Sequence, residues 1–441
     1  MSLRDHARLI LDAAIAAADP RAAVQRALRL DGDVLVVADE DRIALDGGGR
    51  VWVIGAGKAA VGMALGARDM LGERISGGTL ATRDGYGGEV PGIYVWEAAH
   101  PVPDTRGLAA AADALACARA AGERDVVLCL LSGGGSALWP APVPGVSLTE
   151  LRALTGTLLR AGATIREINA VRKHLSRIQG GWLAREAYPA RVATLVVSDV
   201  VGSPLDVIAG GPTVPDPTTC ADALGVLSAY EISAPPAALR HLQAGAAGEA
   251  PETPKPFGAE FGGLCAHVVA SNLDALRGAA AEAERLGCGA AILAGDLEGE
   301  AREVAHGIAR AALERQQALS PGAPPLALLL GGETTVTVRG RGTGGRNQEL
   351  ALALALELEG CGGIVAAALG TDGTDGPTLA AGGMVDGETI TRAAAAGLNA
   401  RDHLARNDSN PLLRATGDLL VTGPTGTNVC DVILLLIQPP S

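Results

Sequence analysis

The sequence predicts an α/β protein of two domains, and three observations carry this prediction. Short β-branched runs alternate with Ala/Leu-rich stretches, a pattern typical of parallel strands joined by crossover helices. The 441 residues exceed what one average core holds. Sixty glycines and 25 prolines indicate many tight connections, and with only two Phe, four Tyr and four Trp the core must be built from Ala, Val, Leu and Ile.

Strands are expected where apolar runs lead into glycine-containing loops. Their expected ranges are 51–54, 126–131, 192–197, 267–270, 291–293, 326–330 and 364–368. Open α/β sheets bind ligands at the carboxyl ends of their strands, so functional residues are sought in the loops that follow. Two further segments, 333–338 and 418–437, indicate hairpins in a mixed sheet.

The domain boundary is placed where the periodicity fails, between residues 233 and 263. The run Ala250-Pro-Glu-Thr-Pro-Lys-Pro256 is typical of a semi-rigid, extended linker. We therefore expect an N-terminal domain at 1–240, a linker at 241–262 and a C-terminal domain at 263–441.

Composition argues against several classes of partner. The net charge is −13 and no run of Lys or Arg offsets it, which disfavours nucleic acid and anionic membranes. The seven scattered cysteines lack zinc-finger spacing and are expected to be reduced core residues. The N-terminus is typical of an amphipathic helix and not of a signal peptide, so a cytoplasmic location is expected. The oligomeric state stays open, a homodimer included.

The first loop of interest is Gly55-Ala-Gly-Lys-Ala-Ala60, directly after an expected strand. It fits the dinucleotide pattern G-x-G-x-x-A, with Gly55 and Gly57 as candidate binding residues. Lys58 would lie beside an anion drawn to the N-terminus of the following helix. The alternative is a tight turn with a solvated lysine.

The second loop is a glycine triplet between two serines. Its residues are Ser132, Gly133, Gly134, Gly135 and Ser136. Three consecutive glycines let backbone N–H groups turn inward as an anion nest, to which the serines add hydroxyl donors. No Walker A motif occurs in the sequence, so this loop is favoured as a phosphate or carboxylate cradle over a plain turn.

Polar residues also gather on one expected helix and after one expected strand. Asn169, Arg172, Lys173 and Ser176 are spaced to form a polar, basic helix face, which would bind substrate if it faced a cleft. Asp199 follows the strand at 192–197 and is a candidate ligand of a metal or hydroxyl group. A solvated face and a turn residue are the alternatives.

Arg346 is expected in the first turn of a long helix, after a glycine-rich loop. A cation there opposes the helix dipole by roughly 0.3–1 kcal/mol, so an anion is expected nearby. The alternative is an exposed arginine on a flexible loop. Asp372 and Asp375 lie three residues apart in Gly370-Thr-Asp-Gly-Thr-Asp-Gly376, where carboxylates and nucleotide phosphates could hold Mg²⁺. The alternative for the two acids is a repeated Asp-Gly turn.

Together these loops indicate phosphoryl transfer. Anion nests, one Lys, one Arg and strand-end acids occur without an activated nucleophile, which suits a reaction driven by positioning and charge neutralisation. An NAD(P)H-dependent reductase, with Asp84 holding a ribose, and a non-catalytic sensor of a sugar-acid phosphate are the rival interpretations.

The chain resembles the two-domain glycerate 2-kinases whose C-terminal half contains the MOFRL domain. The motifs that carry the resemblance are Gly55–Ala60, His100-Pro-Val-Pro-Asp104, Leu131–Leu138, Ile168–Ser176, Gly344-Gly-Arg-Asn-Gln-Glu349, Gly370–Gly376 and Gly423-Pro-Thr-Gly-Thr-Asn-Val429. The chain departs from the family pattern at Ala99, Ser203, Gly210 and Cys430, where family members often have Gly, Asp, Ser and Asn.

The resemblance implies a Rossmann-like N-terminal domain with a parallel sheet and a smaller α/β C-terminal domain with a mixed sheet. The MOFRL region would span about 325–435 and the active site would lie between the domains. The implied reaction uses ATP and Mg²⁺ to convert D-glycerate into 2-phosphoglycerate. Lys58 and Arg346 fall on the key Lys and Arg of the family, and we expect them to be catalytic.

Overall fold

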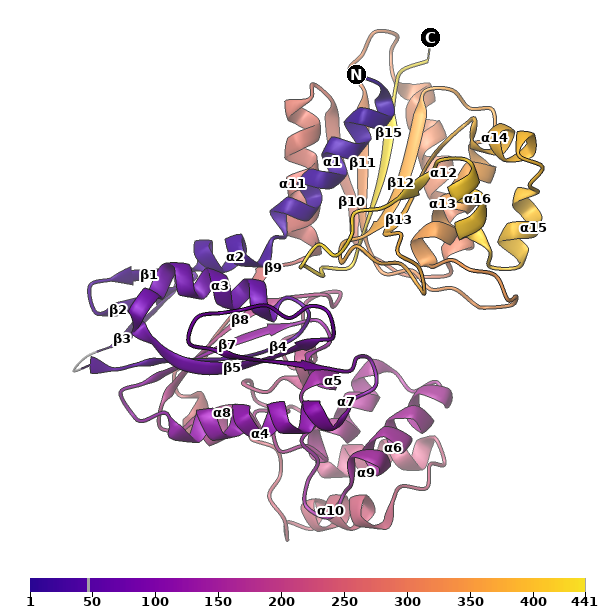
Figure 1. The fold of residues 1–441 in the computed structure, drawn as a ribbon. Coiled ribbons are helices and arrows are strands. Elements are labelled where there is room, and N and C mark those ends of the chain that lie inside the picture. The colour runs from indigo at the N-terminus through magenta and orange to yellow at the C-terminus, as the bar shows by residue number, and fades with distance from the viewer. Residues whose placement is uncertain (46–47, 441) are drawn as a thin grey trace. The chain divides into compact units, whose positions relative to one another are not determined.

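The computed structural model describes residues 1–45 and 48–440, which form two compact units (Figure 1). The central unit comprises Pro20–Val269, and the terminal unit combines Met1–Asp19 with the chain from Ala270 onward. Both units are α/β, as predicted.

A six-stranded sheet forms the core of the central unit. Its strands are β4 (Val51–Ala56), β5 (Ile75–Arg83), β6 (Tyr94–Ala98), β7 (Val126–Ser132), β8 (Arg191–Val197) and β9 (Cys265–Ala270), in the order β6-β5-β4-β7-β8-β9. The pairings from β6 to β8 are parallel. The order reverses between β4 and β7, which is the topological switch point where Rossmann-like sheets bind their ligands.

Helices cover both faces of this sheet (Figure 1). On one face lie α4 (Thr105–Ala120) and α8 (Trp182–Ala187), whose alanines pack against the apolar strands. On the other lies α3 (Ala60–Leu71), itself covered by α2 (Pro20–Ala27). Every residue of β7 is buried, because helices cover both faces of the sheet. This burial explains why the sequence of β7 is a continuous apolar run.

A helical layer completes the central unit beyond the short α5 (Gly135–Leu138). Its members are α6 (Leu148–Arg160), α7 (Ile165–His174), α9 (Cys220–Ala229) and α10 (Pro236–Ala246), which share a small apolar core. Helices α6, α7 and α9 each begin at a capping box, in which a Ser or Thr and an acid three residues later satisfy free backbone N–H groups.

A three-stranded antiparallel sheet of β1 (Leu28–Asp31), β2 (Val34–Val37) and β3 (Asp41–Ala44) precedes β4. Within the described part of the chain, 3₁₀ turns lie at Gly72–Arg74, Ile208–Gly210 and Ala259–Phe261.

The terminal unit is built on a mixed sheet, as predicted. Its strands are β10 (Gly289–Leu297), β11 (Leu326–Gly332), β15 (Asp431–Ile437), β12 (Ile364–Gly370), β13 (Gly382–Asp386) and β14 (Leu419–Leu420), in that spatial order. Only β10 and β11 pair in parallel; the other pairs are antiparallel. Its helices are α1 (Leu3–Ala17), α11 (Asn272–Arg285), α12 (Ala301–Ala318), α13 (Arg346–Glu357), α14 (Thr389–Ala395), α15 (Ala400–Ala405) and α16 (Ser409–Ala415).

All seven expected strands are present, but the two expected hairpins are not. Residues 333–338 make only an isolated bridge between Thr335 and Glu300. In the segment 418–437, β14 pairs with β13 while β15 inserts between β11 and β12. The sequence around β15 is typical of one strand of a hairpin, but the strands that pair with β15, which are β11 and β12, lie far away in the sequence.

The compact units divide the chain differently from the expected ranges 1–240, 241–262 and 263–441. Helix α1 packs on α11 and on the sheet of the terminal unit, and Arg4 pairs with Asp418 at 2.7 Å. The segment expected as a linker belongs to the central unit, where Pro254 accepts a hydrogen bond from the Asp216 amide at 3.0 Å. The strand expected at 267–270 joins the central sheet as β9.

Within the described ranges, no helix is long and apolar enough to cross a membrane.

Candidate active site

The loops that follow β4 and β7 touch each other at the switch point of the central sheet. The Lys58 amide donates to the carbonyl of Gly133 at 3.0 Å, and the Ala59 amide donates to Ser132 Oγ at 3.0 Å. Gly57, at φ 137°, would place a Cβ only 2.1 Å from Ser132 Oγ. The two loops therefore form one backbone surface, and it tolerates no side chain at residue 57.

The glycine triplet continues this surface into the short helix α5. Gly134 has a left-handed φ of 86°, and a Cβ on it would lie 2.9 Å from the His100 ring. Gly135 begins α5 and is packed against Ala56 O and the Ala209 side chain. Close approach to the His100 ring at Gly134, and to Ala56 O and the Ala209 side chain at Gly135, accounts for two of the three successive glycines.

A cavity of about 390 Å³ opens beside this loop in the central unit. Six residues from the sequence-predicted set line it: Gly133, Gly134, Gly135, Ser136, Asn169 and Asp199. Arg152, Arg172, Ser176 and Gln179 contribute further polar groups, and His100 lies at the glycine triplet. The cavity thus combines a glycine-rich backbone surface with two guanidinium groups.

Arg172 is one of the two arginines that line the cavity, whose lining also includes the acid Asp199. Its guanidinium donates to the carbonyl of Ser136 at 3.0 Å, and no carboxylate of the described chain pairs with it. Although the side chain is partly exposed to the cavity, protein atoms enclose the guanidinium, and this burial lowers the pKa of Arg172 to about 10. The group stays charged at neutral pH, so the cavity offers a cation without a counter-ion.

Two buried polar atoms on the cavity wall also lack hydrogen-bond partners among the described residues. They are Asn169 Oδ1 and Arg152 Nε. Unsatisfied buried polar atoms are uncommon in folded proteins because each costs about 1–3 kcal/mol. A bound polar ligand in the cavity would relieve that cost.

Other predicted residues do not line the cavity. Lys173 is 2% exposed and lies 3.2 Å from Asp206 Oδ2 and 3.4 Å from Asp216 Oδ1. Asn169, Arg172 and Ser176 share one side of the chain at this point, while Lys173 turns into the protein behind it. Gly55 lies within β4, where a Cβ would meet Leu130 O at 2.8 Å, so it is a packing glycine.

In the terminal unit, Arg346 begins α13 and is held by two acids. Its Nε lies 2.6 Å from Asp431 Oδ2, its Nη2 lies 3.0 Å from Asp431 Oδ1, and its Nη1 lies 2.6 Å from Glu333 Oε1. Burial alone would lower the pKa of Arg346, but Asp431 and Glu333 raise it above its ordinary value. The anion expected beside this cation is therefore supplied, in the described chain, by Asp431 at the start of β15.

Asp431 and Glu333 are the residues that sequence reasoning missed here. In the sheet register, Asp431 is opposite both Gly332 and Gly370, so it lies where β11 and β12 end. The only hint of Asp431 in the sequence is that one acid directly precedes the apolar run of β15. Its nearness to Arg346 cannot be predicted until the antiparallel pairing of β15 is known.

The two predicted metal ligands differ in their surroundings. Asp375 is buried; its Oδ1 accepts from the Asn347 amide at 3.1 Å, and its Oδ2 accepts from the Gln348 amide and side chain, each at 2.9 Å. Burial raises the pKa of Asp375, and the hydrogen bonds from Gln348 and Asn347 oppose this rise. Asp375 thus caps α13, whereas Asp372 Oδ1 accepts from the amide and hydroxyl of Thr374, each at 3.0 Å.

Comparison with known proteins places this chain in a family. Residues 6–243 match the family described as a domain of unknown function, DUF4147, and residues 326–431 match the MOFRL family. A glycerate 2-kinase of Pyrococcus horikoshii is 40% identical over 439 residues, which cover 99% of this chain and 98% of the relative. The chain belongs to the glycerate kinase family. The crystal structure of a glycerate kinase from Thermotoga maritima, 41% identical, has a TM-score of 0.88 and covers 99% of this chain and 100% of its own.

Another relative in this glycerate kinase family has a different name. A protein of Agrobacterium vitis is 42% identical over 439 residues, which cover 99% of this chain and 95% of the relative. It carries the provisional name hydroxypyruvate reductase. The family relationship therefore leaves a second activity to be tested for this chain.

Replacing Gly57 with alanine should destabilise the central unit strongly. The new Cβ would have to displace the backbone of Ser132, whose carbonyl oxygen would lie 2.5 Å away. We expect a loss of about 2–4 kcal/mol, which combines the left-handed strain with the steric cost. All four tryptophans (Trp52, Trp96, Trp139 and Trp182) lie in the central unit, so urea unfolding followed by tryptophan fluorescence reports on it.

Gly85→Ala is the matched control for this prediction. Gly85 lies in the same unit at φ 80°, and a Cβ on it would meet nothing within 4 Å. It should lose only the conformational cost of about 1 kcal/mol. Equal losses in the two variants would show that the contact between the loops does not constrain residue 57.

Proposed function

We propose that this chain transfers a phosphoryl group from ATP to the 2-hydroxyl group of D-glycerate. The observation that carries the proposal is the cavity at the switch point of the central sheet, where the unpaired Arg172 faces the glycine triplet. A small acid with one carboxylate and neighbouring hydroxyl groups suits such a lining. The names of the relatives from Pyrococcus horikoshii and Thermotoga maritima support the same substrate.

In this proposal the glycerate carboxylate binds Arg172 and the backbone N–H groups of the Ser132–Ser136 loop. Asn169 and Arg152 supply the remaining polar contacts, because each has a buried polar atom that no described residue satisfies. Arg172 takes the role that the sequence suggested for Lys173, whose ammonium group is held by two aspartates. Asp199, which also lines the cavity, would orient the 2-hydroxyl group.

Lys58 and Arg346 would stabilise the phosphoryl group during its transfer. A loose transition state carries negative charge on the three equatorial oxygens of the phosphoryl group, and positioned cations lower its energy. Lys58 is held in its turn by the loop contact described above, and Arg346 is held by Asp431 and Glu333. A general base is not required for such a transition state.

The acids of the terminal unit suit Mg²⁺ in their donor chemistry, because carboxylate oxygens are hard ligands. Asp372 is the better candidate of the predicted pair, since the Asp375 carboxylate already accepts four hydrogen bonds from Asn347 and Gln348 at the start of α13. Mg²⁺, when bound with the nucleotide, would neutralise charge on the phosphates. Asp375 would then position the Arg346 helix.

A reductase is the second candidate function. The strand order of the central sheet and the G-x-G-x-x-A turn are those of dinucleotide-binding domains, and two relatives from Agrobacterium vitis are named as hydroxypyruvate reductases. Against it, Asp84, the residue expected to hold a ribose, is engaged by Arg106 through both carboxylate oxygens at 2.6 and 2.8 Å. We therefore favour the kinase.

One assay separates the candidate functions. Release of ADP is followed with D-glycerate, L-glycerate and hydroxypyruvate, and NMR of the product identifies the phosphorylated position. We expect turnover with D-glycerate and phosphate on C2. Enzyme-like oxidation of NADH or NADPH by hydroxypyruvate, without ADP release, would contradict the proposal; ligand-induced stabilisation without any turnover would favour a sensor.

Arg172→Ala should weaken binding of D-glycerate specifically. A charge-assisted hydrogen bond is worth about 1.5–3 kcal/mol, so the KM for D-glycerate should rise about 10- to 100-fold while the KM for ATP changes little. Arg172→Lys should recover part of the loss. Arg160→Ala, at the exposed end of α6, is the control; an unchanged KM for D-glycerate in Arg172→Ala would exclude this residue from the substrate site.

Lys58→Ala and Arg346→Ala should each lower kcat far more than they raise either KM. Loss of one group that stabilises transition-state charge costs about 10²–10³-fold in kcat. Arg341→Ala, an exposed arginine in the loop before Arg346, should retain its activity. Near-normal turnover of D-glycerate by either alanine variant would remove that residue from the catalytic machinery.

A further inference from the structure

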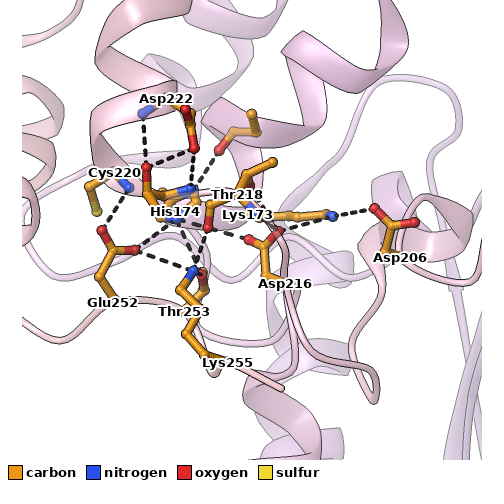
Figure 2. Close-up of polar contacts among 12 residues, drawn as sticks. Lys173, His174, Asp206, Asp216, Thr218, Cys220, Asp222, Glu252, Thr253 and Lys255 are labelled. Atoms are coloured by element: carbon orange, nitrogen blue, oxygen red, sulfur yellow. Dashed lines mark hydrogen bonds and ion pairs between the residues drawn. The ribbon is translucent and has the colours of Figure 1, made fainter. Parts of the chain in front are cut away.

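A second cluster in the central unit brings together a histidine, a cysteine and a carboxylate (Figure 2). His174 Nε2, Cys220 Sγ and a carboxylate oxygen of Glu252 lie within 4.8 Å of one another. They come from the last residue of α7, the first residue of α9 and the segment that follows α10. None of them lies among the residues proposed above for catalysis or substrate binding.

The hydrogen bonds of His174 leave one ring nitrogen facing acids. His174 Nδ1 lies 2.7 Å from the carbonyl oxygen of Ala170, so Nδ1 carries a proton and donates it. A neutral imidazole then has a lone pair at Nε2, which lies 3.0 Å from Glu252 Oε2 and 3.9 Å from Asp216 Oδ2. The Thr253 hydroxyl lies 3.2 Å from Nε2, and the two acids are partly compensated by lysines: Lys255 Nζ lies 3.6 Å from Glu252 Oε2, and Lys173 Nζ lies 3.4 Å from Asp216 Oδ1. A cation bound at Nε2 would remove the remaining repulsion between its lone pair and the carboxylate oxygens.

Asp216 provides an independent sign of a missing ligand. Its side chain is fully buried, and its Oδ1 accepts from the amide and hydroxyl of Thr218 at 3.0 and 2.8 Å. Its Oδ2 has no hydrogen-bond partner among the described residues. A buried carboxylate oxygen without a partner is costly, and this one is directed at the histidine nitrogen of the cluster.

We propose that this cluster is a zinc site whose ligands are His174, Cys220, Glu252 and Asp216. One imidazole nitrogen, one thiolate and carboxylate oxygens form a donor set that suits Zn²⁺, which prefers four ligands in a tetrahedron. Metal bonds of about 2.0–2.3 Å place tetrahedral ligands roughly 3.3–3.8 Å apart. Glu252 Oε2 and Asp216 Oδ2 lie 3.0 and 3.9 Å from His174 Nε2, and Cys220 Sγ lies within 4.8 Å of the histidine and Glu252 ligand atoms. The Nδ1–H bond to Ala170 is the outer contact that metal-binding histidines ordinarily make.

The charge of the surroundings favours a divalent cation. The network in Figure 2 contains the carboxylates Asp206, Asp216, Asp222 and Glu252 and the ammonium groups Lys173 and Lys255. With the Cys220 thiolate counted, the negative groups outnumber the two ammonium groups by three, so a doubly charged ion would reduce the excess negative charge to one. Zinc binding would displace the proton of the Cys220 thiol, because the thiolate is the form that binds the metal.

The site would have a structural role with a connection to the substrate cavity. The ion would join α7, α9 and the segment around Glu252, which otherwise lacks regular structure. Asn169 and Arg172 lie on α7 only a few residues before His174, so the ion would fix the helix that presents them to the cavity. A separate cavity of about 200 Å³, lined by His174, His241 and Thr253 among others, offers a path to the site.

Metal binding to the full chain tests the proposal. After treatment with a chelator, the protein is titrated with Zn²⁺, Co²⁺ or Mg²⁺, and thermal unfolding is followed by tryptophan fluorescence. We expect one equivalent of Zn²⁺ to bind and to raise Tm by about 5 °C at 100 times its Kd, with no effect of equal Mg²⁺. Co²⁺ should produce a thiolate-to-metal charge-transfer band. Absence of that band in the wild-type protein would overturn the proposal regardless of how any variant folds.

Matched variants locate the ion. Cys220→Ser should abolish the cobalt band, and Glu252→Gln should weaken binding at least 10-fold, because Gln keeps the shape of the side chain but loses its charge. Cys117→Ser, a cysteine on α4 outside the cluster, should behave as the wild type. A band that survives Cys220→Ser but disappears in Cys265→Ser would place the ion beside Asp41 and His267 and contradict the proposed ligands.

Discussion

The contact between the loops after β4 and β7 is the constraint on which the candidate site depends. Gly57 lies against the Ser132 backbone so closely that no side chain fits, and the Lys58 and Ala59 amides are bonded to the neighbouring loop. This contact fixes the start of α3, the direction in which residue 58 leaves the sheet, and the path of the glycine triplet along the cavity. The parallel order of the sheet makes it possible, because both strands end at the same edge.

In the terminal unit, Arg346 is held in one orientation by ion pairs, whereas Lys58 is held by close packing of two loops. Arg346 begins a helix, where a cation is unfavourable, and the bidentate contact with Asp431 offsets that cost. Asp375 caps the same helix by accepting hydrogen bonds from the backbone amides of Asn347 and Gln348. The two buried acids, Asp431 and Asp375, therefore both help to hold the Arg346 guanidinium in place: Asp431 by direct contact and Asp375 through the helix. Such an arrangement is expected where a charged group must keep one orientation.

Much of the fold and part of the candidate site could be predicted from local sequence. The remaining features depend on contacts between residues that are distant in the sequence. The apolar strands, the glycine loops and the helix of Arg346 each have a signature within ten residues. The pairing of Asp431 with Arg346 and the packing of α1 in the terminal unit have none, since their partners lie far along the chain. Lys173 and Arg172 are adjacent in sequence, and only the positions of Asp206 and Asp216 decide which one turns inward. The cysteines lacked zinc spacing for the same reason: the proposed ligands span residues 174–252.

The proposed phosphoryl transfer requires that Lys58 and Arg346 act on one phosphoryl group. A double-mutant cycle on the single-turnover rate of phosphoryl transfer from ATP to D-glycerate tests it directly, with the wild type, Lys58→Ala, Arg346→Ala and the double variant. If both cations act on the same group, the double variant will lose less transition-state stabilisation than the two single losses together, with a coupling of about 1 kcal/mol or more. Losses that add to within about 0.3–0.5 kcal/mol would instead show that Lys58 and Arg346 have independent roles.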